Sequence, residues 1–259
     1  MIVAQLPVRF AALAAMAMPI LALPPTAALA NETPRFAVEV EGGPVWQSLN
    51  DAQIPNDATG TRFSVRDLVG SGPWPAGRVY FSWNLSGRRS LRALVAPLSI
   101  TETGVLERPA DFAGAAYQPG VATEGTYRFN SYRVSYRYRV HEGARWNWWI
   151  GLTAKIRDAK IELRQGAVTS RKTDFGFVPL LHVAGDWRLA PRWRLGLDAD
   201  ALAGGPGRAE DVALKLAHDL CDRWTIAGGY RMVEGGADVD EVYTFAWLHY
   251  AVASATYRF

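Results

Sequence analysis

From about residue 35 onward, apolar and polar residues alternate with a period of two. In the stretch YRVSYRYRV, tyrosines and valines occupy the even positions from 132 to 140, and arginines and a serine occupy the odd positions between them. Successive side chains of a β-strand point to opposite faces of the sheet, so this pattern predicts strands with one apolar and one charged face. The stretches VYFSWNL, WRLGLDADAL and the final TFAWLHYAVASATYRF alternate in the same way.

Ten such strands are predicted, and the connections between them alternate in length. The expected strands are 35–48, 77–85, 89–100, 127–140, 145–164, 174–188, 192–203, 209–220, 224–233 and 243–259. Short turns such as LSGRR and HEGA alternate with longer connections around 49–76, 101–126, 165–173, 204–208 and 234–242. Short turns at one end and longer loops at the other are typical of outer-membrane barrels. The predicted fold class is therefore all-β, a closed antiparallel up-and-down transmembrane β-barrel of ten strands.

Two stretches leave eight or twelve strands as alternatives. GTRFSVRDLV, in the first long connection, alternates and could be a further strand or a loop hairpin above the membrane. ALVAPLSI has no clear polar face, and Pro97 cannot donate a hydrogen bond to a ladder. A soluble periplasmic β-sandwich, whose charged faces would meet bulk water, also stays open, although its Greek-key connections give no reason for alternating loop lengths.

The first thirty residues read as a secretory signal peptide, so a mature barrel domain of residues 31–259 is expected. Arg9 is followed by an apolar run and then by Ala28-Leu29-Ala30, a small-x-small cleavage pattern. The apolar run is shorter than the ~20 residues of a transmembrane helix and contains prolines. Cys221 is the only cysteine, so no disulfide framework is available to a secreted chain. The 28 Lys and Arg against 25 Asp and Glu are interspersed, which predicts no nucleic-acid partner.

The last strand carries the most specific signal. It ends in ATYRF, with Tyr257 and Phe259 on the same face. Together with the alternation and the turn asymmetry, this ending resembles that of small single-chain bacterial outer-membrane β-barrels, in general character the OmpA-, OmpX- and OmpW-like proteins, without placing the chain in one family. The resemblance implies a bacterial outer-membrane location and contact with outer-membrane lipids. It also implies recognition of Tyr257 and Phe259 by the barrel-assembly machinery. The oligomeric state is left open.

The predicted inner faces collect charges of both signs. The candidate lumen residues are Glu39, Glu41, Arg133, Arg137, Arg139, Lys155, Arg157, Asp198, Asp200 and Arg231, together with Asp211, Lys215 and Asp219. They could line a narrow pore for small solutes or pair into a plug, and a barrel of about ten strands is close to the size that side chains fill. The prediction is an integral outer-membrane protein with a structural or surface role, or a narrow porin-like pore.

A lipid- or peptide-processing enzyme on a barrel scaffold is the alternative function. Such an enzyme needs a histidine with a serine or carboxylate partner. His182 could face inward near Asp186, but at mid-strand, and His249 has only Trp247 and Ala251 beside it on its own face. No catalytic residue, metal site or cofactor is therefore predicted from spacing, and the acidic loops match no calcium-binding motif.

Overall fold

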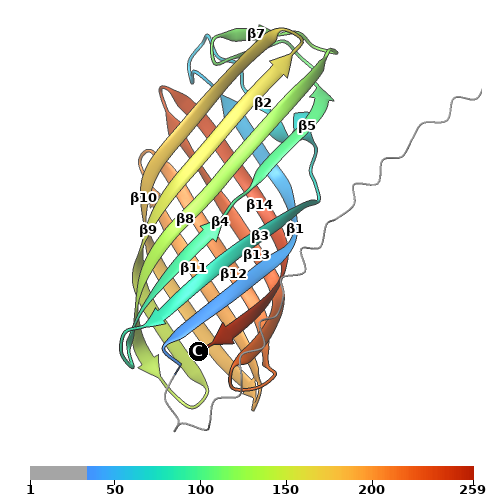
Figure 1. Ribbon diagram of the computed structural model, residues 1–259. Helices are drawn as coiled ribbons and strands as arrows, with labels where there is room; N and C mark the ends of the chain where they lie inside the picture. Colours follow the sequence, from blue (N-terminus) through green and yellow to red (C-terminus); the bar gives the residue numbers. More distant parts are fainter. Residues whose placement is uncertain (1–33) are drawn as a thin grey trace, which may run out of the picture. The chain divides into compact units, whose positions relative to one another are not determined.

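The computed structural model describes residues 34–259, which form a barrel of ten antiparallel strands (Figure 1). The predicted signal peptide, residues 1–30, lies outside the described residues. The wall consists of β1 (Phe36–Gln53), β3 (Trp74–Asn84), β4 (Arg89–Ala96) continued by β5 (Ser99–Val105), β8 (Ala122–Glu142), β9 (Trp146–Gln165), β10 (Val168–Ala190), β11 (Trp193–Gly204), β12 (Gly207–Asp219), β13 (Trp224–Val239) and β14 (Val242–Arg258). Each wall strand pairs with its neighbours in sequence, and β14 pairs with β1 to close the barrel. Because the sheet closes on itself into one barrel and does not form two packed sheets, the alternative of a soluble β-sandwich is excluded.

The interruption at Pro97 does not change the register of the wall. Ala96 pairs with Ser131, and after two residues Ser99 pairs with Arg128 of the same strand, β8. The side chain of Asn130 accepts a hydrogen bond from the backbone N–H of Leu98 at 3.1 Å. The strand therefore passes the proline without losing alignment, because a side chain replaces the backbone acceptor there.

The alternative that GTRFSVRDLV adds a further wall strand is wrong, because this segment forms the two-residue strand β2 (Phe63–Ser64) and the short helix α1 (Val65–Val69). Ser64 caps the helix by accepting a hydrogen bond from the N–H of Asp67 at 3.1 Å. The buried residues of the helix, at 65, 68 and 69, have helical spacing, which the short alternating pattern concealed. They pack among Ile100, Tyr127 and other residues of an apolar cluster, and the barrel keeps ten strands.

The strict alternation of loop lengths is also wrong. Long connections occur only after β1 and after β5, and the second of them contains the hairpin of β6 (Ala110–Phe112) and β7 (Ala115–Tyr117). The other three expected long loops are two-residue turns, because the strands continue further than their clear alternation. Gly166 makes the first of these turns with φ of +58°, a left-handed conformation that glycine adopts without steric cost.

The outer face is an apolar band with a ring of aromatic side chains at the end that holds both barrel termini. The ring contains Phe36, Trp83, Trp146, Trp187, Trp193, Trp224, Tyr257 and Phe259. We call this end the lower end, as it is drawn in Figure 1. Aromatic girdles are characteristic of the two interfaces of a membrane barrel. Within residues 34–259, no helix is long and apolar enough to cross a bilayer.

The upper rim of the barrel is oblique. Strand β10 pairs with β9 along its whole length, but with β11 only from Leu181 onward. The hairpin of β11 and β12 turns at Gly204–Gly207, so the upper part of β10, from Val168 to Leu180, has no strand partner on that side. Strands β8, β9 and β10 therefore rise above the hairpins of β11 to β14 (Figure 1). The wall is open on one side above these hairpins.

Candidate functional site

A layer of buried ion pairs crosses the middle of the lumen. Its centre is Asp211 on β12, which is 2 % exposed. The carboxylate of Asp211 accepts hydrogen bonds from Arg78 at 2.9 Å, Arg133 at 2.7 Å and Arg231 at 2.5 Å. The three arginines come from β3, β8 and β13, so one carboxylate connects opposite sides of the barrel. Buried charges are stable only when paired and hydrogen-bonded in this way.

Two further carboxylates complete this layer. Glu41 accepts hydrogen bonds from Arg231 at 3.0 Å and from the ammonium group of Lys215 at 2.9 Å. Asp200 accepts hydrogen bonds from Arg133 at 2.8 Å and Thr153 at 2.7 Å, and its Oδ1 lies 2.8 Å from His182 Nδ1. These ion pairs connect opposite sides of the wall, and we call the group the lumen cluster: Glu39, Glu41, Arg78, Arg133, His182, Asp200, Asp211, Lys215 and Arg231.

The sequence-predicted lumen residues lie at three levels. Seven belong to the lumen cluster: Glu39, Glu41, Arg133, Asp200, Asp211, Lys215 and Arg231. Asp219 pairs with Arg194 at 2.8 Å. Asp198 pairs with Arg92 at 2.7 Å, and Arg137 lies over the ring of Trp149. Arg139 lies at the lower mouth, where it contacts Glu142 and the carbonyl of Gly87. Lys155 and Arg157 lie above the layer. The prediction missed Arg78 and Arg92, although both alternate with apolar neighbours.

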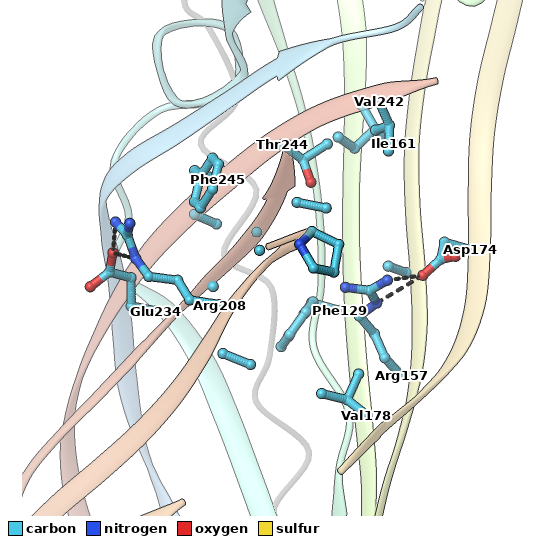
Figure 2. A pocket seen from close by; sticks show the side chains of 18 of the residues that line it. Phe129, Arg157, Ile161, Asp174, Val178, Arg208, Glu234, Val242, Thr244 and Phe245 are labelled. Carbon is cyan, nitrogen blue, oxygen red and sulfur yellow. Dashed lines mark hydrogen bonds and ion pairs between the residues drawn. The ribbon is translucent and has the colours of Figure 1, made fainter. Parts of the chain in front are cut away.

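Above the lumen cluster lies a cavity of about 370 Å³ (Figure 2). Six basic residues line it, at positions 128, 155, 157, 160, 172 and 208, against two acidic residues, Asp174 and Glu234. Apolar residues from β8, β9, β10 and β14 form much of the remaining wall, including Phe129, Ile161, Val178 and Phe245. The cavity therefore combines a basic balance of charge with a large apolar surface.

Lys155 supplies a cation at this cavity without an ion-pair partner. The residue is 3 % exposed, and no carboxylate oxygen within the described part of the chain lies within the 4.0 Å of an ion pair from its Nζ. Its ammonium group lies 4.8 Å from the centre of the Phe129 ring, a cation–π contact. Arg157, by contrast, pairs with Asp174 (Figure 2). An uncompensated buried ammonium is costly, so an anion at this position would be stabilised.

The cavity reaches the outer face of the barrel above the β11–β12 hairpin. Arg208 and Glu234 pair with each other and share the phase of the exposed residues Leu214 and Tyr230 on their strands. Both line the cavity (Figure 2), together with lumen-facing residues such as Lys155. Because residues of both the outer and the inner face line the cavity, the cavity opens through the side of the barrel, at the point where its upper rim is low.

The expectation that His249 has no hydroxyl neighbour is wrong. Ser48 Oγ on β1 lies 2.8 Å from His249 Nε2, and the Tyr230 hydroxyl on β13 lies 2.5 Å from His249 Nδ1. The sequence could not show this, because Ser48 meets His249 only when β1 pairs with β14 to close the barrel, and Tyr230 meets His249 only through the register of β13 on β14. His182 faces inward as expected, but its partner is Asp200, while Asp186 accepts from Asn147 at 3.0 Å.

The candidate sites contain no metal centre within residues 34–259, where no three His, Cys, Asp or Glu side chains are grouped to hold an ion. Comparison with known proteins concerns the fold. No family model matches the sequence, and no curated protein matches it. Among solved structures, the outer-membrane protease OmpT of Escherichia coli is similar with a TM-score of 0.53 and 10 % identity, over 87 % of this chain and 97 % of OmpT.

This chain has the fold of the small bacterial outer-membrane β-barrels. Two further structures are similar at lower scores. One is the attachment invasion locus protein Ail of Yersinia pestis, with a TM-score of 0.38 and 9 % identity, over 88 % of this chain and 100 % of Ail. The other is the toluene transporter TodX of Pseudomonas putida, with a TM-score of 0.37 and 9 % identity, over 88 % of this chain and 91 % of TodX. At these identities the similarity concerns the architecture of the barrel and not its role.

Proposed function

We propose that this protein is an integral outer-membrane barrel, closed to bulk solute flow, that binds an anionic amphiphile in its upper cavity. The apolar band and the lower aromatic ring support insertion into a bilayer with the lower end at the periplasm. One observation indicates the class of ligand: the ammonium group of Lys155 lies at a cavity that is partly apolar and opens through the side of the barrel.

The lumen cluster supports a closed barrel over an open pore. Its carboxylates are shared among arginines from opposite walls, and Asp211, Glu41 and Arg231 are each at most 2 % exposed. In an open, water-filled pore these charges would be hydrated separately, because a solvent-exposed ion pair is only slightly more stable than its two hydrated charges. We infer that the layer separates the upper cavity from the lower mouth.

The cavity supports an amphiphile over a purely polar solute. An acidic head group can meet Lys155 at the floor, while an apolar chain can lie against Phe129 and Val178 and leave through the low side of the rim. Phe175 and Phe177, just above the level of the hairpin, are 75 % and 64 % exposed on the outer face. Such exposure suits contact with lipid beside the opening.

Binding of a fluorescent fatty acid, 11-(dansylamino)undecanoic acid, to the detergent-solubilised full chain tests this proposal. We expect saturable binding that oleate displaces and dodecyltrimethylammonium does not. Lys155→Met should weaken binding about tenfold or more, since a charge-assisted hydrogen bond contributes about 1.5–3 kcal/mol. Arg223→Met, which removes one positive charge at an exposed lower turn, is the control and should bind normally. Equal binding by the Lys155 variant would overturn the proposal.

A further inference from the structure

Three polar side chains form a hydrogen-bonded chain on the outer face of the barrel. Ser48 Oγ lies 2.8 Å from His249 Nε2, and His249 Nδ1 lies 2.5 Å from the hydroxyl of Tyr230. All three are at least partly exposed. When Nδ1–H donates to the phenol oxygen, Nε2 is left to accept the proton of the serine. A nucleophile, a base and a group that orients the base, in this order, are the recognised arrangement of an activated serine.

Ser48 lies at an irregularity in the wall. In the ladder between β1 and β14, Gln47 pairs with Leu248 and Leu49 pairs with Trp247, so Ser48 is the extra residue of a β-bulge. Gln47 faces the lumen and is 2 % exposed, whereas Ser48 is exposed. Bulges redirect a side chain locally, and they occur often beside functional sites. Ser48 also shares the outward phase of Trp46, which pairs with His249, so the alternation and the bulge both place its side chain on the outer face.

The surroundings suit a lipid ester. The cluster lies near the upper limit of the apolar band, because Glu234 pairs across the ladder with Trp247, two residues from His249. Toward the lower end, β14 presents Ala251, Ala253 and Ala255 on the same face, over about 13 Å at the rise of a strand. Gly42 and Gly228 flank Ala253 in register. This strip of small residues leaves room for an acyl chain below His249, beside the serine.

We propose that Ser48, His249 and Tyr230 form a hydrolytic site for the acyl esters of membrane lipids. Ser48 Oγ forms a bond to the ester carbonyl carbon while its proton passes to His249 Nε2. The bond from carbon to the alcohol oxygen breaks, and that oxygen takes the proton from His249. Water then attacks the acyl-serine, giving its proton to His249. The free fatty acid leaves, and Ser48 regains its proton. Tyr230 is a positioning residue that holds the imidazole tautomer.

This site is separate from the lumen cavity, so its test does not depend on the amphiphile proposal. The purified full chain is mixed with detergent micelles that contain phosphatidylethanolamine in one experiment and lipid A in a second. The free fatty acid released is then measured. We expect release by the wild type and background release by Ser48→Ala and His249→Gln. Removal of a general base typically costs 10²–10⁴-fold in rate. Ser254→Ala, which alters an inward-facing serine on the strand of His249, is the matched control and should retain the activity.

Three more results decide the role of each part. An alkyl fluorophosphonate should label wild-type Ser48 covalently with loss of fluoride, located by peptide mass spectrometry, and this measurement needs no variant to fold. Tyr230→Phe should lower kcat about tenfold with little change in KM and should alter the pH–rate profile. Gly228→Leu should be tolerated by the fold, since a Cβ there meets no atom closer than 3.7 Å, and it should raise KM by covering the strip. Absence of both label and fatty acid release in the wild type would overturn the proposal, as would Ser48→Ala activity equal to the wild type.

Discussion

The peptide groups of Phe36 and Phe259 exchange two hydrogen bonds of 2.9 Å, and their ring centres lie 5.8 Å apart. The last residue of the chain is thereby joined to the first residue of β1, and the barrel closes at its lower end. Tyr257 stacks on Phe259 at 5.9 Å and lies 4.9 Å from Trp224. The closing contact and the lower aromatic ring are therefore the same structure.

We propose that this end strand is also the assembly signal, and deletion of Phe259 tests it. The deletion removes both hydrogen bonds to Phe36 and one ring of the aromatic girdle. We expect much less heat-modifiable, membrane-inserted protein in cells, measured by gel mobility of unboiled membranes. Phe259→Tyr keeps the aromatic ring and should assemble normally. Normal insertion of the truncated chain would refute the assembly role.

Neutralising Asp211 should destabilise the folded barrel strongly. Asp211→Asn leaves Arg78, Arg133 and Arg231 without their common anion. Breaking a buried ion pair by removing one partner costs about 3–5 kcal/mol. Urea unfolding in lipid vesicles, followed by tryptophan fluorescence, measures the change in the free energy of unfolding. Asp222→Asn, in an exposed lower turn, should change it by less than about 0.5 kcal/mol. Equal stability of the two variants would contradict the role given to the lumen cluster.

The lumen cluster should also keep the barrel closed to ions. We expect no steady conductance of the wild type in planar bilayers. Removing a pair together, Glu41→Ala with Arg231→Ala, takes two large side chains out of the layer while balancing charge, and it should produce measurable conductance. Arg208→Ala with Glu234→Ala removes an ion pair on the outer face and should stay closed. A wild type that conducts steadily would show that the layer does not seal the lumen.

Gly104 should be needed for the seating of helix α1. A Cβ at this residue would lie 2.1 Å from the carbonyl oxygen of Leu68, so the helix would have to move. We expect Gly104→Ala to lower stability by about 1–3 kcal/mol, as overpacking does, and to increase cleavage by trypsin at Arg62 or Arg66. At Gly87, in a lower turn, a Cβ meets no atom within 4 Å, and Gly87→Ala should be neutral. Unchanged proteolysis of the Gly104 variant would contradict this packing.

The sequence by itself determined the barrel, because alternation is a local property of each strand. The even and odd positions from Tyr132 to Val140 predicted an apolar outer face and a charged inner face, and the closed ten-strand fold confirms the architecture. Local pattern failed where it was short or ambiguous. The helix at Val65–Val69 was hidden in the short alternating stretch GTRFSVRDLV, and the start of β10 and the end of β13 extend beyond their clear alternation.

Only the tertiary structure decided which side chains meet. Asp211 joins arginines from β3, β8 and β13, and Ser48, His249 and Tyr230 come from β1, β14 and β13. These partners are up to 201 positions apart in sequence, and their contact depends on strand register, one β-bulge and the pairing of the last strand with the first. Spacing along a chain contains none of that information, because register is fixed by the whole closed sheet.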